Sequence, residues 1–266
     1  MAALVLLLQV RIGINKMTVI NNSLLIKLLS FILLLIFWLI LASILNIETL
    51  PSPLDVFFKL QKDLSNGSLI YHLSITLYRV LVSFLLAMFI GVAIGILMGN
   101  NKKIDNILDS WNIIFLNIPA LVLIILSYVW FGLTELAAII AVSLNKIPNV
   151  IVTIREGARA VNRDLLQVAE VYKVNKTKKF TLFYLPQLYP YLIASARGGI
   201  SLIWKIVLVV ELLGRSNGIG FKLHEFFQFF DITSILAYTF AFVVIMIAIE
   251  NLFFVPLDKM ANKWRT

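Results

Sequence analysis

Long apolar runs alternate with short polar segments along this chain. A helix needs about 20 mainly apolar residues to cross the hydrocarbon core of a bilayer, so the pattern predicts six membrane spans. They are expected near residues 24–45, 77–99, 111–131, 135–154, 188–213 and 235–257. Pro119, Lys146 and Pro148 interrupt the third and fourth runs, and membrane helices tolerate prolines where neighbouring groups satisfy the freed backbone.

The predicted fold class is therefore all-α, a polytopic membrane protein. The spans form one transmembrane domain, residues 24–257, between an N-terminal segment, residues 1–23, and a C-terminal tail, residues 258–266. Met17 is as compatible with a translation start as Met1 is.

Composition agrees with this class. Of the 266 residues, 61% are hydrophobic and 14% are charged, which is more apolar surface than a soluble domain can bury. The net charge of +9 is interpreted as the Lys and Arg excess of cytoplasmic loops, with no nucleic-acid partner. The chain has no cysteine, and His72 and His224 lie far apart in sequence, so no metal site is expected.

Lys and Arg also predict the orientation, because loops that stay in the cytoplasm carry most of these residues. With both termini inside, fourteen lie in inside segments: Arg11, Lys16, Lys102, Lys103, Arg155, Arg159, Arg163, Lys173, Lys176, Lys178, Lys179, Lys259, Lys263 and Arg265. At most five lie outside: Lys59, Lys62, Arg215, Lys222 and Arg79. Both ends are expected in the cytoplasm.

Two local patterns predict further detail. After the first span, "LPSPLDVFFKL" places Ser52 as a helix cap, Pro53 at the first helical position and Asp55 at the third, which predicts a short helix along the membrane surface. In the second span, small residues recur at every fourth position: Ala87, Gly91, Gly95 and Gly99. Such a row allows a close helix pair, within the chain or with a second copy.

A polar stretch in mid-chain predicts an amphipathic cytoplasmic helix over residues 155–172, directly continuing the fourth span. Val161, Leu165, Val168 and Tyr172 fall within about 60° on a helical wheel. Arg155, Arg159, Arg163 and Glu170 lie opposite. Such a helix either lies on lipid headgroups or docks onto a cytoplasmic partner.

The fifth span carries a stripe that we predict lines a translocation pathway. Arg197, Ser201, Trp204, Leu208 and Glu211 are spaced by four, three, four and three residues. An ionisable residue inside a span is costly unless it faces protein or water. The alternative is that Arg197 and Glu211 only reach the two membrane interfaces. The following "GRSNGIGF" favours a mobile external turn.

The mid-chain stretch resembles the cytoplasmic loop of bacterial ABC importer permease subunits, the binding-protein-dependent inner-membrane components. Their loop reads E-A-A, then Gly a few residues later, then L-P about a dozen further on. Here the frame is Gln167, Val168, Ala169, Lys173 and Leu185-Pro186. Gln167 and Lys173 depart from the pattern, and Lys173 in place of Gly is expected to alter the turn after the helix.

Other segments resemble the branch that imports nitrate, sulfonates, taurine and thiamine-precursor pyrimidines. They are "LPSPLDVF", "TLYRVLVSFLLAMFIGVAIGILMG", "NIPALVLIILSYVWFG" and "VELLGRSNGIGF", in that order between about residues 50 and 221.

The resemblance implies a permease subunit in the bacterial inner membrane, with a second copy of itself, two ATPase subunits and an extracytoplasmic substrate-binding protein. The loop, about residues 155–187, would hold the coupling helix. Residues implied for ATPase coupling are Val161, Leu165, Gln167, Val168, Ala169, Tyr172, Lys173 and Pro186. The chain contains no G-x-x-x-x-G-K-[ST] loop, so ATP is expected to be bound and hydrolysed by a separate subunit, with no cofactor here.

Two other classes compete with this interpretation. A stand-alone secondary transporter of a small solute is the main alternative, although no inverted repeat of interrupted helices is visible. An intramembrane enzyme would need a catalytic constellation within the spans, and none converges there. We therefore expect a non-enzymatic permease in contact with membrane lipids.

Overall fold

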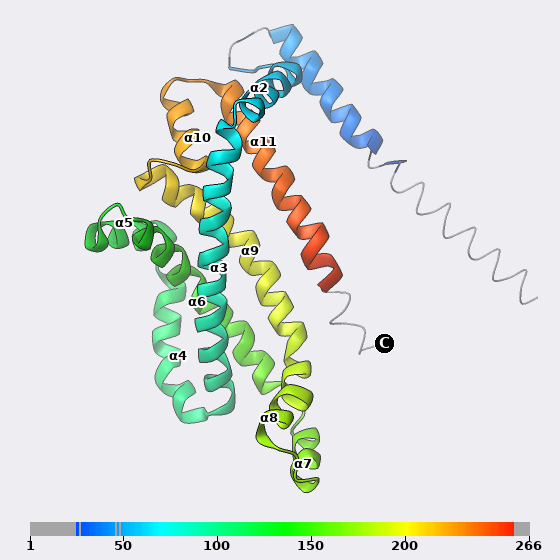
Figure 1. Ribbon diagram of the computed structural model, residues 1–266, viewed down its shortest axis with the longest axis vertical. Helices are drawn as coiled ribbons and strands as arrows, with labels where there is room; N and C mark the ends of the chain where they lie inside the picture. The colour runs from blue at the N-terminus through cyan, green and yellow to red at the C-terminus, as the bar shows by residue number, and fades with distance from the viewer. Residues whose placement is uncertain (1–24, 27, 46, 48, 258–266) are drawn as a thin grey trace, which may run out of the picture.

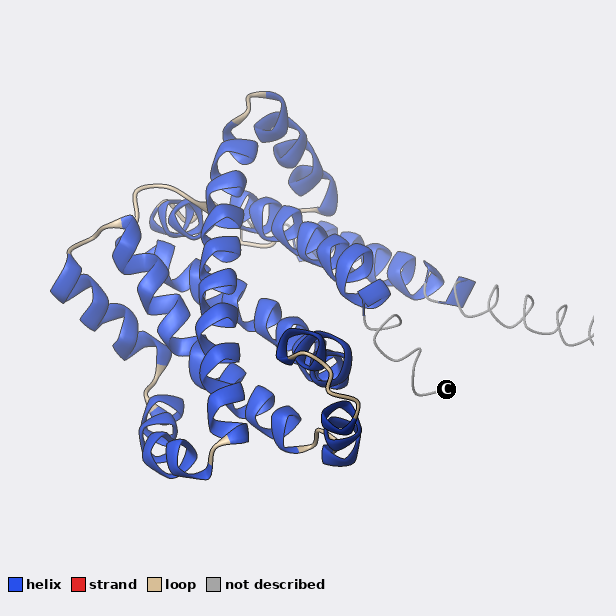
Figure 2. Ribbon diagram, turned by 60° about the horizontal axis from the view of Figure 1, so that its bottom comes forward, coloured by secondary structure: helices blue, strands red, loops and turns tan. Residues whose placement is uncertain are grey.

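The computed structural model describes residues 25–26, 28–45, 47 and 49–257, and these are helical between short connections (Figures 1 and 2). The expected segments 1–23 and 258–266 lie outside the described residues. After the first spanning helix, Leu28–Leu45, the elements are α2 (Pro53–Ser65), α3 (Ser68–Asn100), α4 (Lys102–Asn117), α5 (Ala120–Phe131), α6 (Glu135–Arg159), α7 (Arg163–Val171), α8 (Lys176–Lys179), the π-helical turn η1 (Phe180–Tyr184), α9 (Leu185–Gly214), α10 (Ile219–Gln228), α11 (Ile232–Ile249) and the π-helical turn η2 (Glu250–Phe254).

Five helical segments in the described part of the chain are long and apolar enough to cross a membrane. They are Leu28–Leu45, Ser68–Asn100, Glu135–Arg159, Lys176–Gly214 and Ile232–Leu257. The second, fourth and fifth predicted spans thus belong to helices longer than the apolar runs themselves.

The prediction of one continuous span over residues 111–131 is wrong. Two helices, α4 and α5, occupy this region and are bent by 96° with respect to each other, so that together they form at most one broken span. Pro119 causes the break, because a residue before proline is pushed out of the helical region. Ile118 is accordingly extended, with φ −73° and ψ 123°.

The predicted helix after the first span is confirmed as α2. The Ser52 hydroxyl accepts a hydrogen bond from the Asp55 backbone N–H at 3.2 Å, and the Asp55 carboxylate accepts one from the Ser52 N–H at 3.1 Å. This reciprocal arrangement is a capping box, which satisfies two backbone donors that the first turn of a helix leaves free.

The small residues of α3 form a close contact with α6, and these two helices are the most extensively packed pair. A Cβ built on Gly91 would lie 2.6 Å from Cβ of Val150, and one on Gly95 would lie 2.8 Å from Cβ of Ile154. The close-packing role predicted for the row is confirmed, and it is met within one chain. It fixes α6 against α3 over three helical turns.

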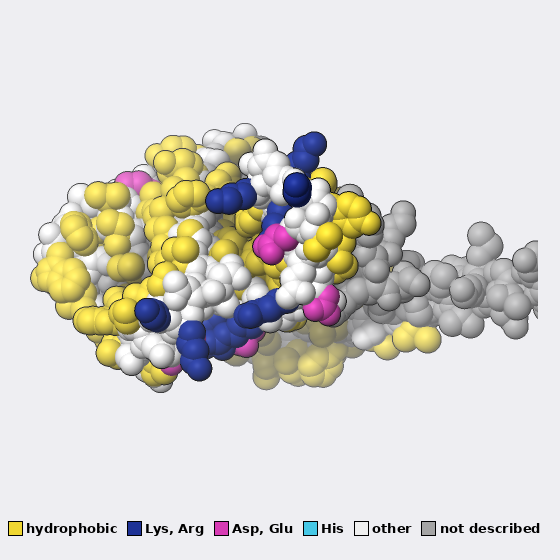
Figure 3. All heavy atoms as spheres, turned by 90° about the horizontal axis from the view of Figure 1, so that it is seen from below, with side chains coloured by type: hydrophobic (Ala, Val, Ile, Leu, Met, Phe, Trp, Pro, Cys, Tyr) yellow, Lys and Arg dark blue, Asp and Glu magenta, His cyan; other side chains and the backbone are white. Residues whose placement is uncertain are grey.

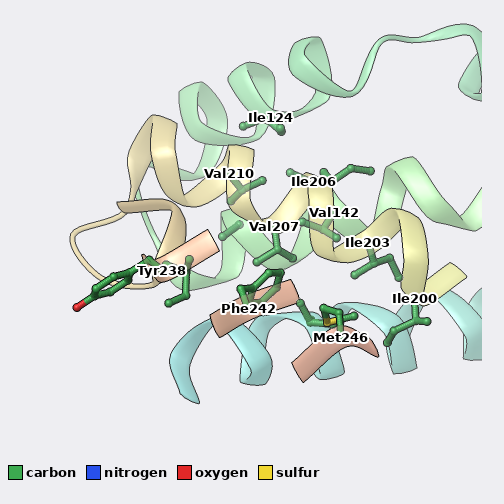
Figure 4. Close-up of a cluster of buried hydrophobic side chains, with 14 of the residues drawn as sticks. Ile124, Val142, Ile200, Ile203, Ile206, Val207, Val210, Tyr238, Phe242 and Met246 are labelled. Carbon is green, nitrogen blue, oxygen red and sulfur yellow. The ribbon is translucent and has the colours of Figure 1, made fainter. Parts of the chain in front are cut away.

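Figure 4 shows α9 at the centre of the larger apolar cluster. Ile124 of α5, Val142 of α6, and Tyr238, Phe242 and Met246 of α11 converge on five residues of α9: Ile200, Ile203, Ile206, Val207 and Val210. A second cluster lies toward the other end of α6 and includes Ile154, Val161, Tyr184 and Leu188. Helix α9 therefore contacts both clusters and positions every site described below.

We predict that Gly91→Ala destabilises the protein by about 1–3 kcal/mol, because the added methyl overpacks the α3–α6 contact. The measurement is the temperature at which detergent-solubilised protein loses its monodisperse peak in size-exclusion chromatography. Gly198→Ala is the matched control, since no heavy atom lies within 4 Å of its Cβ position. Equal melting temperatures for the two variants would contradict the packing role.

Candidate functional site

A groove between α9 and α11 has a volume of about 620 Å³. It is lined by Ala194, Arg197, Gly198, Ile200, Ser201, Trp204, Val243, Met246, Ile247 and Glu250. An ion pair bridges the two helices here, with Arg197 Nε 2.6 Å from Glu250 Oε1. The groove is thus largely apolar, and the Arg197 guanidinium at its wall is paired with the Glu250 carboxylate.

The predicted pathway stripe divides into two parts. Arg197, Ser201 and Trp204 line the groove. Leu208 instead packs partly buried against the larger apolar cluster. Glu211 is 0% exposed and does not face the groove or an interface. The same face of α9 therefore borders the groove in its first half and the protein interior in its second half.

Glu211 belongs to a buried polar network centred on Arg79 of α3, which is 1% exposed. The Arg79 guanidinium donates to Glu211 Oε1 at 2.8 Å, to Glu135 Oε1 at 2.6 Å and to the Asn217 carbonyl at 2.9 Å. Arg215 adds a second cation, 2.7 Å from Glu135 Oε2. A buried charge persists only when it is paired and hydrogen-bonded in this way.

The network forms because the chain after α9 folds back over it. Gly218 has φ +105°, a conformation that favours glycine. A Cβ on Gly220 would lie 2.2 Å from the Leu208 carbonyl oxygen, so α10 can cover α9 only with glycine there. The Gly220 N–H also donates to Glu211 Oε2 at 2.8 Å. The "GRSNGIGF" segment is therefore packed in its second half, where we expected a mobile turn.

We predict that Glu211→Ala destabilises the protein by about 3–5 kcal/mol, since it leaves Arg79 and Arg215 with one carboxylate, Glu135, between two cations. Glu250→Ala is the matched control: it also removes the acid of an ion pair, but one at half-exposed side chains, and should cost at most about 1 kcal/mol. Both are measured as heat-induced loss of the folded peak in detergent. A Glu211→Ala protein as stable as the Glu250→Ala protein would refute the structural role of the network.

The end of the molecule that carries α7 and α8 differs from the prediction in one respect. The amphipathic segment is not continuous with α6, because the helix ends at Arg159 and α7 begins at Arg163. Asn162 caps α7, its side chain accepting from the Asp164 N–H at 2.8 Å. The Asn162 backbone N–H donates to the side-chain oxygen of Gln187 at 2.8 Å. Gln187 follows Pro186 in the first turn of α9, so this hydrogen bond attaches the loop to the start of that helix.

The predicted ridge also divides. Val161 is buried in the smaller apolar cluster, and Ala169 is the buried residue of α7. Leu165 and Val168 are about half exposed, at 46% and 47%, and Tyr172 is 79% exposed. Val171, which the helical wheel did not select, is equally exposed and extends the same surface. An apolar patch of four side chains, Leu165, Val168, Val171 and Tyr172, therefore remains uncovered; we call it the α7 patch. Gln167 is exposed beside it.

Lys173 adopts a left-handed conformation with φ +51°. Its N–H donates to the Glu170 carbonyl at 2.9 Å, and the Val174 N–H donates to the Ala169 carbonyl at 2.9 Å. This pair of bonds is a Schellman motif, whose left-handed position glycine usually occupies. The expected change of turn is thus not seen, because Lys173 takes up the backbone geometry that glycine favours.

Lys173→Gly should stabilise the loop by about 1 kcal/mol, because glycine lacks the Cβ that makes the left-handed region unfavourable. The measurement is amide hydrogen exchange of α7, which should slow about fivefold. Lys176→Gly is the control, since that residue lies inside a helical turn, where glycine should speed exchange. Faster exchange in the Lys173→Gly protein would contradict the assignment.

Cations gather over the same end of the molecule (Figure 3). The exposed ones include Lys102, Lys103, Arg159, Arg163, Lys173, Lys176 and Lys178. Arg155 and Arg159 of α6 pair with Asp109 and Asp105 of α4, and Lys179 pairs with Glu170 across the loop. The α7 patch therefore stands in a rim of mainly positive charge.

Spanning helices around an open groove, with an exposed amphipathic helix at one end, define a membrane transport protein. Residues 91–262 match the family of binding-protein-dependent transport system inner membrane components, and the chain belongs to that family. The resemblance inferred from the sequence is confirmed.

Named relatives are similar over most of the chain. The aliphatic sulfonates transport permease protein SsuC of Bacillus subtilis is 27% identical over 223 residues, which are 84% of this chain and 80% of that protein. The nitrate import permease protein NrtB of Synechocystis is 30% identical over 197 residues, 71% of each. The relatives of this chain are transport permeases, and the chain is not an enzyme.

The fold also matches a solved one. A crystal structure of an amino acid ABC transporter with histidines superposes with a TM-score of 0.58, covering 76% of this chain and 97% of that chain at 18% identity. This match supports the all-α permease fold.

Proposed function

We propose that this chain is the membrane-spanning subunit of an ATP-driven importer, and that it forms the translocation pathway for a small anion. Its partners would be a second copy of itself, two ATPase subunits and an extracytoplasmic substrate-binding protein. ATP would be bound and hydrolysed on the ATPase subunits, because this chain has no phosphate-binding loop of its own.

The α7 patch carries the proposal. Two of its four side chains, Val171 and Tyr172, are each 79% exposed. A compact apolar surface held on a capped helix is typical of a docking element that lays one face into a partner's groove. The charged rim favours a partner with acidic groups around that groove.

Charge supports the orientation. The end that carries α7 and α8 has the exposed cations of Figure 3, so it would face the cytoplasm together with both termini. Helices α2 and α10 lie at the opposite end (Figure 1), where a binding protein would deliver the solute.

The choice of solute rests on the relatives. Proteins named for aliphatic sulfonates and nitrate share most of this chain's length, which favours an anion over a thiamine-precursor pyrimidine. Arg197, Ser201 and Trp204 would line part of its route along α9, with Leu208 and Glu211 holding the end of the helix in place.

The test is co-purification of the ATPase with Leu165→Asp and Val168→Asp. A carboxylate placed in a dry interface costs several kcal/mol, so each variant should lose at least tenfold of the ATPase that the unchanged chain retains. Solute-stimulated ATP hydrolysis in proteoliposomes should fall with it, while membrane insertion stays normal.

Gln167→Glu is the matched control, because it adds a carboxylate to the same helix beside the patch and restores the family's residue. It should keep both readouts. Normal co-purification and hydrolysis with both Asp variants would exclude α7 as the docking element. Uptake without any associated ATPase would instead support a stand-alone secondary transporter.

A further inference from the structure

Arg79 and Lys146 are the buried cations in the described part of the chain. Arg79 has two carboxylates and a carbonyl as acceptors. Lys146, in the middle of α6 and 7% exposed, has no hydrogen bond or ion pair within the described residues. An ammonium inside a membrane span is costly unless water or an opposite charge meets it. The structure supplies no such charge from these residues.

The side chain of Lys146 crosses α9 where that helix has two successive glycines. A Cβ on Gly199 would lie 3.1 Å from Cε of Lys146, so the stem passes directly over the Gly199 backbone. Gly198, the residue before it, is exposed, and no heavy atom lies within 4 Å of its Cβ position. Lys146 therefore packs against Gly199, and the neighbouring Gly198 lines the groove on an adjacent side of α9.

The face of α6 beside Lys146 is polar although the helix spans the membrane. Asn145, Asn149 and Thr153 follow one another at four-residue spacing, and none of the three is buried. The Asn149 amide and the Thr153 hydroxyl donate back to carbonyls of their own helix, at 3.4 Å and 3.1 Å. These groups suit water or a second polar surface better than lipid tails.

We propose that Lys146 is an anion-attracting residue of the translocation pathway, placed between α6 and α9 to meet a solute with one small oxyanion group. This inference rests on the proposed function for the existence of a pathway, and it assigns the charge that selects the solute.

Arg197 is a weaker candidate for that task. It lines the groove, but Glu250 already meets its guanidinium, so the pair presents little net charge. Lys205 is exposed and lies over the ring of Trp204, 5.5 Å from its centroid. Lys146 alone among these three combines burial with an uncompensated charge.

The experiment uses the chain's lack of cysteine. Gly198→Cys, in membrane vesicles that contain the whole transporter, places one thiol in the groove, at the residue before the Gly199 that Lys146 crosses. Two thiol reagents of opposite charge are compared: sulfonatoethyl methanethiosulfonate, an anionic alkyl sulfonate, and trimethylammonioethyl methanethiosulfonate, a cation. Each forms a mixed disulfide with the thiol and releases methanesulfinate, and the mass of the permease records the added group.

A nearby unit charge raises the local concentration of anions and lowers that of cations. The ratio of the anionic to the cationic rate should therefore fall about tenfold when Lys146→Met is added, and by a similar factor with Lys146→Gln. Lys146→Arg should keep the ratio within about twofold. Lys205→Met is the matched control, because it also removes one positive charge, but at a position two helical turns beyond Gly198 on α9. It should change the ratio less than about twofold.

An unchanged ratio in both neutral variants would overturn the proposal. So would a Gly198→Cys protein whose new thiol reacts with neither reagent, because water would then not reach the groove next to the α9 residue that Lys146 crosses. The result is separable from the test of the proposed function: loss of ATPase docking leaves the rate ratio intact, and a flat ratio leaves docking intact.

Discussion

The fold depends on one buried arginine. Arg79 sits inside α3, and its guanidinium joins α6 through Glu135, α9 through Glu211 and the connection to α10 through Asn217. Removing two charges from water is expensive, and only complete pairing recovers that cost. The arrangement therefore exists only when the four segments are in register. It sets the position of α9, and with it the groove and both apolar clusters.

The two surfaces of interest lie at different distances from this anchor. The α7 patch is carried at the far end of the bundle, held by a cap and by the hydrogen bond from Asn162 to Gln187. The groove lies between the Arg79 network and the α7 patch, along the half of α9 that α10 leaves uncovered. The groove and the α7 patch are thus separate surfaces, and α9 connects the parts of the molecule that carry them.

Much of this architecture could be predicted from the sequence, because it follows from local rules. Apolar length gave the spans, the capping residues Ser52 and Asp55 gave α2, and the small residues of α3 indicated a close helix pair. The burial of Leu208 and Glu211 could not be predicted in this way. A helical wheel finds which residues share a face, but it does not tell which neighbour covers that face at each turn. The cover is α10, and its only signal is the pair Gly218 and Gly220.

The breaks were equally hard to place. Pro119 was visible as an interruption, yet a proline can bend a span slightly or turn it by 96°, and the packing of α4 against α6 decides between these outcomes. Lys146 likewise appeared only as a polar interruption. Its lack of partners became apparent once α3 and α9 were in place around it.

The segment from Lys176 to Gly214 is helical without a break, through α8, η1 and α9. At about 1.5 Å per residue its 39 residues extend for nearly 60 Å. One end adjoins α7, and the other ends three residues beyond Glu211. A displacement of its α7 end would be carried along this helix toward the network around Arg79, and the places where the helix could bend and absorb it are η1, Pro190 and the Gly198–Gly199 pair.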